Sequence, residues 1–175
     1  KDVESSWHNY IKSINGSKNI DINSKQFKKL VRCGIPNKQR ACMWCKILGV
    51  FEKMNQLNTE YNQDLYYYTL RNISEETFAF NTEAFEQIMM DVPRTFSGAT
   101  CFSPGSVLNI LKVFAILHPD IGYCQSLNFI AAIIATVIQD EEPAFWAFEI
   151  IITKYFPSQY FVPSMFDLSV DLCMT

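Results

Sequence analysis

The chain has 175 residues, of which 49% are hydrophobic and 19% are charged, and its formal net charge is −3. This composition is typical of a globular domain with a sizeable core and excludes an intrinsically disordered chain. It also disfavours nucleic acid as a partner, because the cations form no block beyond Lys25 to Lys29.

Apolar residues recur at helical spacing throughout the chain, and no alternating strand pattern persists. The sequence therefore predicts an all-α domain of eight or nine helices. In the first half, we expect a helix over 3–14, a polar segment over 17–24, a short helix through 27–31, a helix over 37–48, a polar segment over 55–64 and a tyrosine-rich core stretch over 65–70.

In the second half, we expect a helix over 82–92, a loop around 97–98, and helices over 104–117, 122–138 and 140–155. The longest apolar run, Leu127–Ile138, is too short to span a bilayer, which takes about 20 residues, so a buried core helix is expected. The chain is interpreted as one excised domain over 1–175, in which residues 1–27 form an N-terminal helix and a linker.

The six cysteines do not follow the even framework of a small secreted domain, so we expect free thiols in a reducing compartment. Two cysteine-based sites are weaker alternatives: a zinc site on Cys33, Cys42 and Cys45, and a hydrolase site on Cys124 and His118. The first lacks a fourth ligand and the second lacks a third group to orient its base. No metal site is expected, and the sequence has no glycine-rich phosphate-binding loop.

Arg94 is the first candidate functional residue. Pro93 has no N–H and disfavours helical geometry at Val92, so a helix must end or kink there. This places Arg94 near the surface at a helix exit, where Asp91 can hold its guanidinium. Taken alone, the local sequence favours an ordinary exposed ion pair, which contributes at most about 1 kcal/mol.

Gln125 is the second candidate. It lies in the polar segment Gly122–Asn128, at the start of an apolar helix. A glutamine there can cap the helix, form hydrogen bonds in the core, or point outward and bind a water molecule. The local sequence leaves these alternatives open.

Three motifs in a fixed order carry more information than either residue alone. They are Arg40-x-x-x-Trp44, Ile88-x-x-Asp91-x-x-Arg94 and Tyr123-x-Gln125. Together they resemble the signature of the TBC domain, a family of activators of Rab GTPases. The flanking segments 34–36, 140–146 and 155–157 agree with this resemblance, which covers about residues 28–172.

The resemblance implies an all-α domain that accelerates GTP hydrolysis on a GTP-bound Rab protein and so regulates vesicle trafficking. Arg94 is implied to be an arginine finger that stabilises charge on the transferred phosphoryl group, and Gln125 a glutamine finger that orients the attacking water. Asp91, Tyr123 and Asn128 are expected to support the two fingers.

The other two motif residues are assigned to structure: Arg40 as a buried or half-buried hydrogen-bonding anchor, and Trp44 as a core residue. The chain is expected to bind no cofactor of its own, since the partner carries GTP and Mg²⁺, and to act as an activator rather than an enzyme. The expected location is the cytoplasm, peripheral to endomembranes through the partner, with no transmembrane segment.

The chain also departs from the family pattern. Ser97 and Ser126 stand where members often carry proline and glycine, and the family's domain continues beyond a point like Thr175, so its C-terminal helices are expected to be missing. The alternative function is a catalytically silent module that binds a Rab protein or a scaffold.

Overall fold

The computed structural model describes residues 3–14, 20–60, 67–68, 70–72, 82–95, 103–157 and 160–161. Within these residues every regular element is a helix and no strand occurs, which confirms the all-α prediction. The α-helices are α1 (Val3–Ile14), α2 (Lys25–Arg32), α3 (Asn37–Leu48), α4 (Val50–Glu60), α6 (Thr82–Asp91), α7 (Pro104–Leu117), α8 (Leu127–Val137) and α9 (Glu141–Ile150). A 3-10 turn, η1 (Val92–Arg94), follows α6, and a π-helix, η2 (Ile151–Tyr155), follows α9.

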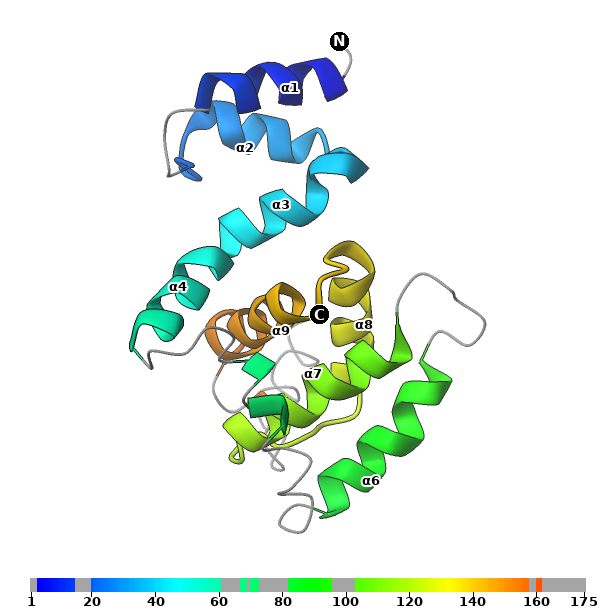
Figure 1. Ribbon diagram of the computed structural model, residues 1–175. Coiled ribbons are helices and arrows are strands. Elements are labelled where there is room, and N and C mark those ends of the chain that lie inside the picture. The colour runs from blue at the N-terminus through cyan, green and yellow to red at the C-terminus, as the bar shows by residue number, and fades with distance from the viewer. Residues whose placement is uncertain are drawn as a thin grey trace.

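Helix α9 lies at the centre of the main core (Figure 1). It packs against α3, α4, α7 and α8, and every residue from Glu142 to Ile150 is buried. Aromatic rings fill much of the space around it; the rings of Phe114 and Phe148, for example, meet edge to face at 5.1 Å. Burying one such side chain stabilises the fold by about 1.5–3 kcal/mol.

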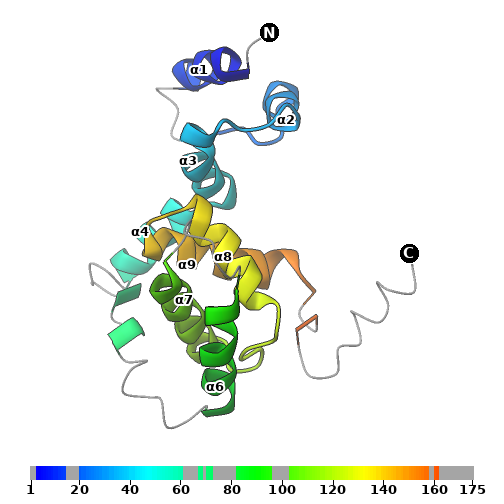
Figure 2. The same cartoon turned by 90° about the vertical axis from the view of Figure 1, so that its right-hand side faces the viewer.

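A second, smaller core joins α1, α2 and the start of α3. Its buried members are Trp7, Tyr10, Phe27 and Met43, and the Trp7 indole N–H donates to the Gly34 carbonyl at 2.8 Å. Figures 1 and 2 show α1 and α2 together at one end of the molecule, far from α6. Residue 27, where the expected N-terminal helix and linker end, lies within α2.

The predicted polar segment over 55–64 is wrong for residues 55–60, which belong to α4. Gly49 closes α3 with a φ of +76°, so the chain turns and starts a new helix at once. Val50, Met54 and Leu57 then recur at helical spacing and pack against the main core. This apolar face outweighs the low helix propensity of the asparagines around it.

The predicted helix over 122–138 begins five residues late, at Leu127. Gly122 and Ser126 both have positive φ values, +59° and +101°, which no α-helix accommodates. Of the tyrosine-rich stretch, Tyr67 is fully buried in the core. The predicted loop at 97–98 lies outside the described residues, and none of the described helices is long and apolar enough to cross a membrane.

Candidate functional site

Arg94 lies at the exit of α6, where Pro93 converts the helix into the turn η1. Its Nε donates to the Met90 carbonyl at 2.9 Å, and its Nη2 donates to Asp91 Oδ1 at 2.9 Å. The side chain nevertheless remains 69% exposed. The segment 91–95, named here the Arg94 segment, thus presents a held guanidinium to solvent.

Asp91 is the centre of this arrangement and is only 4% exposed. While Oδ1 accepts from Arg94, Oδ2 accepts from the Tyr123 hydroxyl at 2.9 Å and from Gln87 Nε2 at 3.1 Å. Burial, and then the bond to Asp91, raise the pKa of Tyr123, so its hydroxyl keeps its proton and stays a donor. A buried carboxylate with three donors is a fixed support for a cation.

Gln125 lies in the connection from α7 to α8, and residues 122–128 are named here the Gln125 segment. Gln125 is exposed and lies outside α8, one residue before the N-cap Ser126. The predicted position at the start of a helix is therefore corrected to a loop position. Ser126 has the left-handed φ of +101°, and its N–H donates to Asn128 Oδ1 at 3.2 Å.

A buried hydrogen bond joins the two segments directly. Asn128 Nδ2 donates to Thr95 Oγ1 at 2.7 Å, and the Thr95 hydroxyl in turn donates to the Asp91 carbonyl at 2.9 Å. Both Thr95 and Asn128 are buried. Together with the Tyr123–Asp91 bond, this makes two cross-links that join the Arg94 segment and the Gln125 segment into one unit.

The sequence did not point to Thr95 or Gln87. Thr95 adjoins Arg94, and Gln87 lies one helical turn before Asp91, so their positions were the only available signal. Arg40 and Trp44 are not tied to this unit: Arg40 is half-buried and donates from Nη2 to the Ile35 carbonyl at 3.0 Å. Trp44 is partly buried and packs against the main core.

Exposed apolar side chains flank both segments. Met89 and Met90 are exposed at the end of α6, and Phe129 and Ile133 are exposed one turn apart on α8. A hollow of about 350 Å³ lies between α6 and the Gln125 segment, lined in part by Gln87, Gly122 and Tyr123. An exposed cation and amide amid apolar side chains suit a protein partner better than a small solute.

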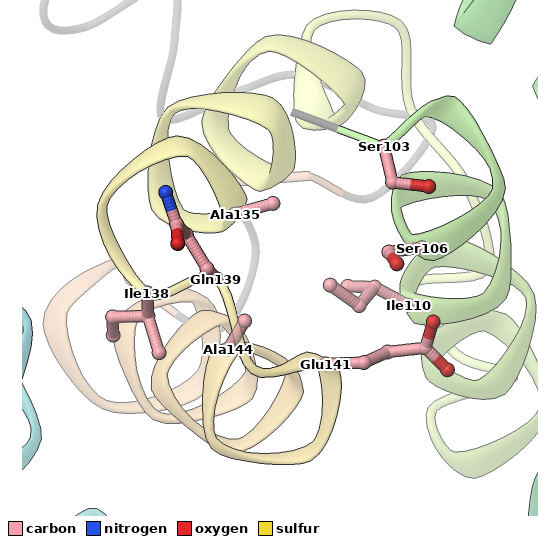
Figure 3. Close-up of a pocket in the computed structure, with 8 residues that line it drawn as sticks. All are labelled: Ser103, Ser106, Ile110, Ala135, Ile138, Gln139, Glu141 and Ala144. Carbon is pink, nitrogen blue, oxygen red and sulfur yellow. The ribbon is translucent and has the colours of Figure 1, made fainter. Parts of the chain in front are cut away.

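A separate cavity of about 220 Å³ lies between the start of α7, the end of α8 and the start of α9 (Figure 3). Its walls include Ile110 and Ala135, and the Glu141 carboxylate lies at its edge. Asn109, Tyr67 and Arg71 all donate to that carboxylate, which therefore links helices rather than awaiting a ligand. No residue of the Arg94 or Gln125 segment lines this cavity.

The cysteine-based alternatives gain no support. Burial raises the pKa of the Cys124 thiol, which makes it a poorer nucleophile, and His118 contacts Glu149 at 3.2 Å. Cys33, Cys42 and Cys45 are free thiols. Among the described residues, no group of three or more potential ligands could hold a metal ion.

Comparisons with known proteins agree on one family. A family model described as the Rab-GTPase-TBC domain matches residues 37–174. The chain is 30% identical over 169 residues to "Growth hormone-regulated TBC protein 1-A" of Danio rerio, covering 93% of the chain and 44% of that protein. It is 31% identical over 154 residues to "Small G protein signaling modulator 3" of Homo sapiens, covering 85% of the chain and 19% of that protein.

A solved structure supports the fold. The Chlamydomonas flagellar RabGAP TBC domain superposes with a TM-score of 0.70 at 17% identity, covering 91% of this chain and 54% of that one. At that identity the likeness concerns the fold alone. The chain spans less than half the length of these curated relatives, and the match to the family model begins after α1 and α2.

Proposed function

Because this chain belongs to the Rab-GTPase-TBC domain family, we propose that it accelerates GTP hydrolysis on a Rab GTPase by supplying Arg94 and Gln125 in trans. The partner binds GTP and Mg²⁺, and this chain contributes two side chains and a docking surface. It is an activator of an enzyme rather than an enzyme with its own substrate.

One observation carries the proposal: the cross-linked pair of segments. Arg94 and Gln125 are both exposed, yet Asp91, Thr95 and Asn128 near them are buried. The Tyr123–Asp91 and Asn128–Thr95 hydrogen bonds join the two segments. Two groups that must reach one reaction centre gain most when their relative position is fixed before the partner arrives. An ordinary surface ion pair would not require this support.

Arg94 stabilises the charge that develops on the transferred phosphoryl group. Its planar guanidinium can donate to two oxygens at once, which an ammonium group cannot do. In the unbound protein Asp91 and the Met90 carbonyl hold this guanidinium. When the partner docks, phosphate oxygens take over part of these contacts while Asp91 keeps the base of the segment in place.

Gln125 orients the attacking water. Its amide oxygen accepts a hydrogen bond from the water, and its amide nitrogen donates to an acceptor on the partner. The left-handed conformation of Ser126 and its bond to Asn128 set the direction in which Gln125 leaves the backbone. Met89, Met90, Phe129 and Ile133 provide apolar area for docking around the two side chains.

This role places the protein in the regulation of vesicle trafficking, in the cytoplasm and beside the endomembranes that carry its partner. The test is GTP hydrolysis by a panel of purified Rab proteins with and without this protein. We expect a large acceleration on a few of them, lost in both Arg94→Ala and Gln125→Ala. Binding without acceleration on any Rab protein would instead establish a catalytically silent binding module.

A further inference from the structure

The first 49 residues and the rest of the chain carry opposite net charge, although the whole chain has a net charge of only −3. Residues 1–49 contain ten Lys or Arg and three Asp or Glu, a net charge of +7, whereas residues 50–175 contain five and fifteen, a net charge of −10. The described part before Val50 holds only two carboxylates, Glu4 and Asp21. The basic part forms α1, α2 and α3. Helices α1 and α2 lie at the end of the molecule farthest from α6, and α3 leads from them to the main core (Figure 2).

Four of these cations form a single stripe on α2. Lys25, Lys28, Lys29 and Arg32 are all exposed and are spaced i, i+3, i+4 and i+7, so they share one helix face about 100° wide. The opposite face carries Phe27, Leu30 and Val31, which pack into the small core with α1 and α3. Packing thus fixes which way the cations point.

Nothing in the described structure neutralises this stripe. None of the four cations forms an ion pair with another described residue, and Asp21 instead accepts a hydrogen bond from the Asn23 N–H. Placing four like charges on two turns of a helix costs stability through repulsion. This repulsion would be relieved if the four cations bound anions outside the chain.

Aliphatic side chains adjoin the cations. Ile22 is 42% exposed just before α2, and Val3 is 36% exposed at the start of α1. A hollow of about 380 Å³ between α1 and α2 is lined by Val3, Leu30 and Lys29 among others. Cations beside exposed aliphatic groups match the headgroup region of a bilayer, where phosphates and hydrocarbon meet.

We propose that the cationic face of α2 docks this protein on an anionic lipid surface. Each Lys or Arg side chain near such a surface increases partitioning of the protein to it roughly five-fold. The attraction fades within a Debye length of about 8 Å. Because the stripe lies at the far end of the molecule, the acidic remainder stands back from the membrane. The family model begins after α2, so this surface is distinct from the Arg94 and Gln125 segments and does not depend on their proposed role.

A nucleic acid fits these observations less well. The stripe extends over the eight residues of α2, about 10 Å from the first cation to the last, and reaches only a few phosphates. Ile22 and Val3 offer aliphatic area but no aromatic ring on which a base could stack.

The test is binding of the protein to phosphatidylcholine vesicles with and without phosphatidylserine, at low and physiological salt. A triple variant, Lys25→Gln/Lys28→Gln/Lys29→Gln, removes three charges from the stripe. Its control, Lys12→Gln/Lys38→Gln/Lys46→Gln, removes three exposed charges from α1 and α3 and has the same net charge. We expect the stripe variant to lose about 100-fold in partitioning to the anionic vesicles and the control to lose less than about 5-fold.

A further variant, Ile22→Ser, should weaken binding several-fold without changing its salt dependence, since it removes apolar contact and no charge. Thermal unfolding of all variants checks that the fold is kept. Equal losses in the two triple variants, absence of binding to anionic vesicles, or equal binding to vesicles without phosphatidylserine would overturn the proposal. So would tighter binding to RNA or to polyglutamate than to the vesicles, with the same loss in the stripe variant.

Discussion

Two buried carboxylates in this molecule collect hydrogen bonds from distant elements, but they hold different things. Asp91, 4% exposed, holds Arg94, whose side chain is 69% exposed. Glu149, 5% exposed, accepts from Lys53 of α4 and contacts His118 at the end of α7, whose side chains are only 30% and 22% exposed. The first network leaves its cation exposed to solvent, whereas the second encloses its cations and ties α4, α7 and α9 together.

The difference indicates how to tell a functional ion pair from a structural one. Both contain a buried acid and a cation at hydrogen-bonding distance, so distance alone does not separate them. What separates them is where the cation points and whether its removal harms folding or activity.

The largest effect is expected for Arg94→Lys. Lysine keeps the charge but loses the planar fork, and an arginine finger is worth on the order of 10³- to 10⁵-fold in rate. We expect a loss of at least about 10³-fold in kcat/KM for the stimulated GTP hydrolysis, with an unfolding free energy within about 0.5 kcal/mol of the wild type. Arg32→Lys, on the exposed face of α2, is the control and should keep full activity. Wild-type activity in Arg94→Lys would leave Arg94 as a surface ion pair.

Glu149→Ala should show the reverse behaviour. Removing this acid leaves Lys53 and His118 partly buried without their carboxylate, which costs about 2–3 kcal/mol, at the lower end for a broken buried pair because Lys53 reaches solvent. Denaturant unfolding measures this loss, and Glu83→Ala, at an exposed position on α6, should change stability by less than about 0.5 kcal/mol. The stimulated rate per folded molecule should stay unchanged. A lost rate in a folded Glu149→Ala protein would make the two networks alike.

The acid unfolding profile tests the same carboxylate by pH. Burial acts to raise the pKa of Glu149, but the hydrogen bonds with His118 and Lys53 outweigh it, so the pKa lies below its ordinary value of 4.5. The contribution of ionised Glu149 to the unfolding free energy is therefore fully present above about pH 4.5. It is lost as pH falls through the lowered pKa of Glu149 in the folded protein. In Glu149→Gln, the unfolding free energy should fall less steeply below pH 4.5. An unchanged slope would show that other carboxylates govern acid unfolding.

Thr95→Val tests the cross-link between the two segments. Valine keeps the shape but removes the hydroxyl that accepts from Asn128 Nδ2 and donates to the Asp91 carbonyl. We expect a ten- to hundred-fold loss in kcat with little change in KM, or about 1.4–2.7 kcal/mol of barrier, and a stability loss of about 1–2 kcal/mol. Thr95→Ser keeps the hydroxyl and should restore the rate. If both variants lose only stability, the two segments are positioned independently of this bond.

The sequence predicts much of the fold because the residues that start and end its helices act locally. The helices over 3–14, 37–48 and 104–117 have the predicted bounds, and Pro36 and Pro104 mark two of the starts. Helix α4 was missed because its asparagines favour a loop, while the apolar face that packs on α9 is a tertiary effect. The late start of α8 depends on two positive φ values, of which only Gly122 could be anticipated.

The candidate site divides in the same way. Motif order located Arg94, Gln125 and the residues near them, but the bond between Thr95 and Asn128 spans 33 positions. Neither residue predicts that contact, because threonine and asparagine occur in many loops and helix caps. Residue identity therefore indicates which groups are candidates, and only the hydrogen bonds between the Arg94 segment and the Gln125 segment show how they are held.

The smallest effect is expected for a change at Ser126, which tests the backbone beside Gln125. It is the one described non-glycine residue with a positive φ, a conformation that costs about 1–2 kcal/mol for an L-residue with a β-carbon. Ser126→Gly relieves that cost but adds freedom to the unfolded chain, so a net gain of about 0.5–1 kcal/mol in unfolding free energy is expected. Ser126→Ala keeps the β-carbon and should give no gain. If Ser126→Gly stabilises the protein and leaves kcat intact, the Asn128 bond alone directs Gln125. If it stabilises the protein but lowers kcat, the restricted backbone of Ser126 is itself part of what orients Gln125. Backbone strain would then lie beside the Asp91 network and not beside the Glu149 network.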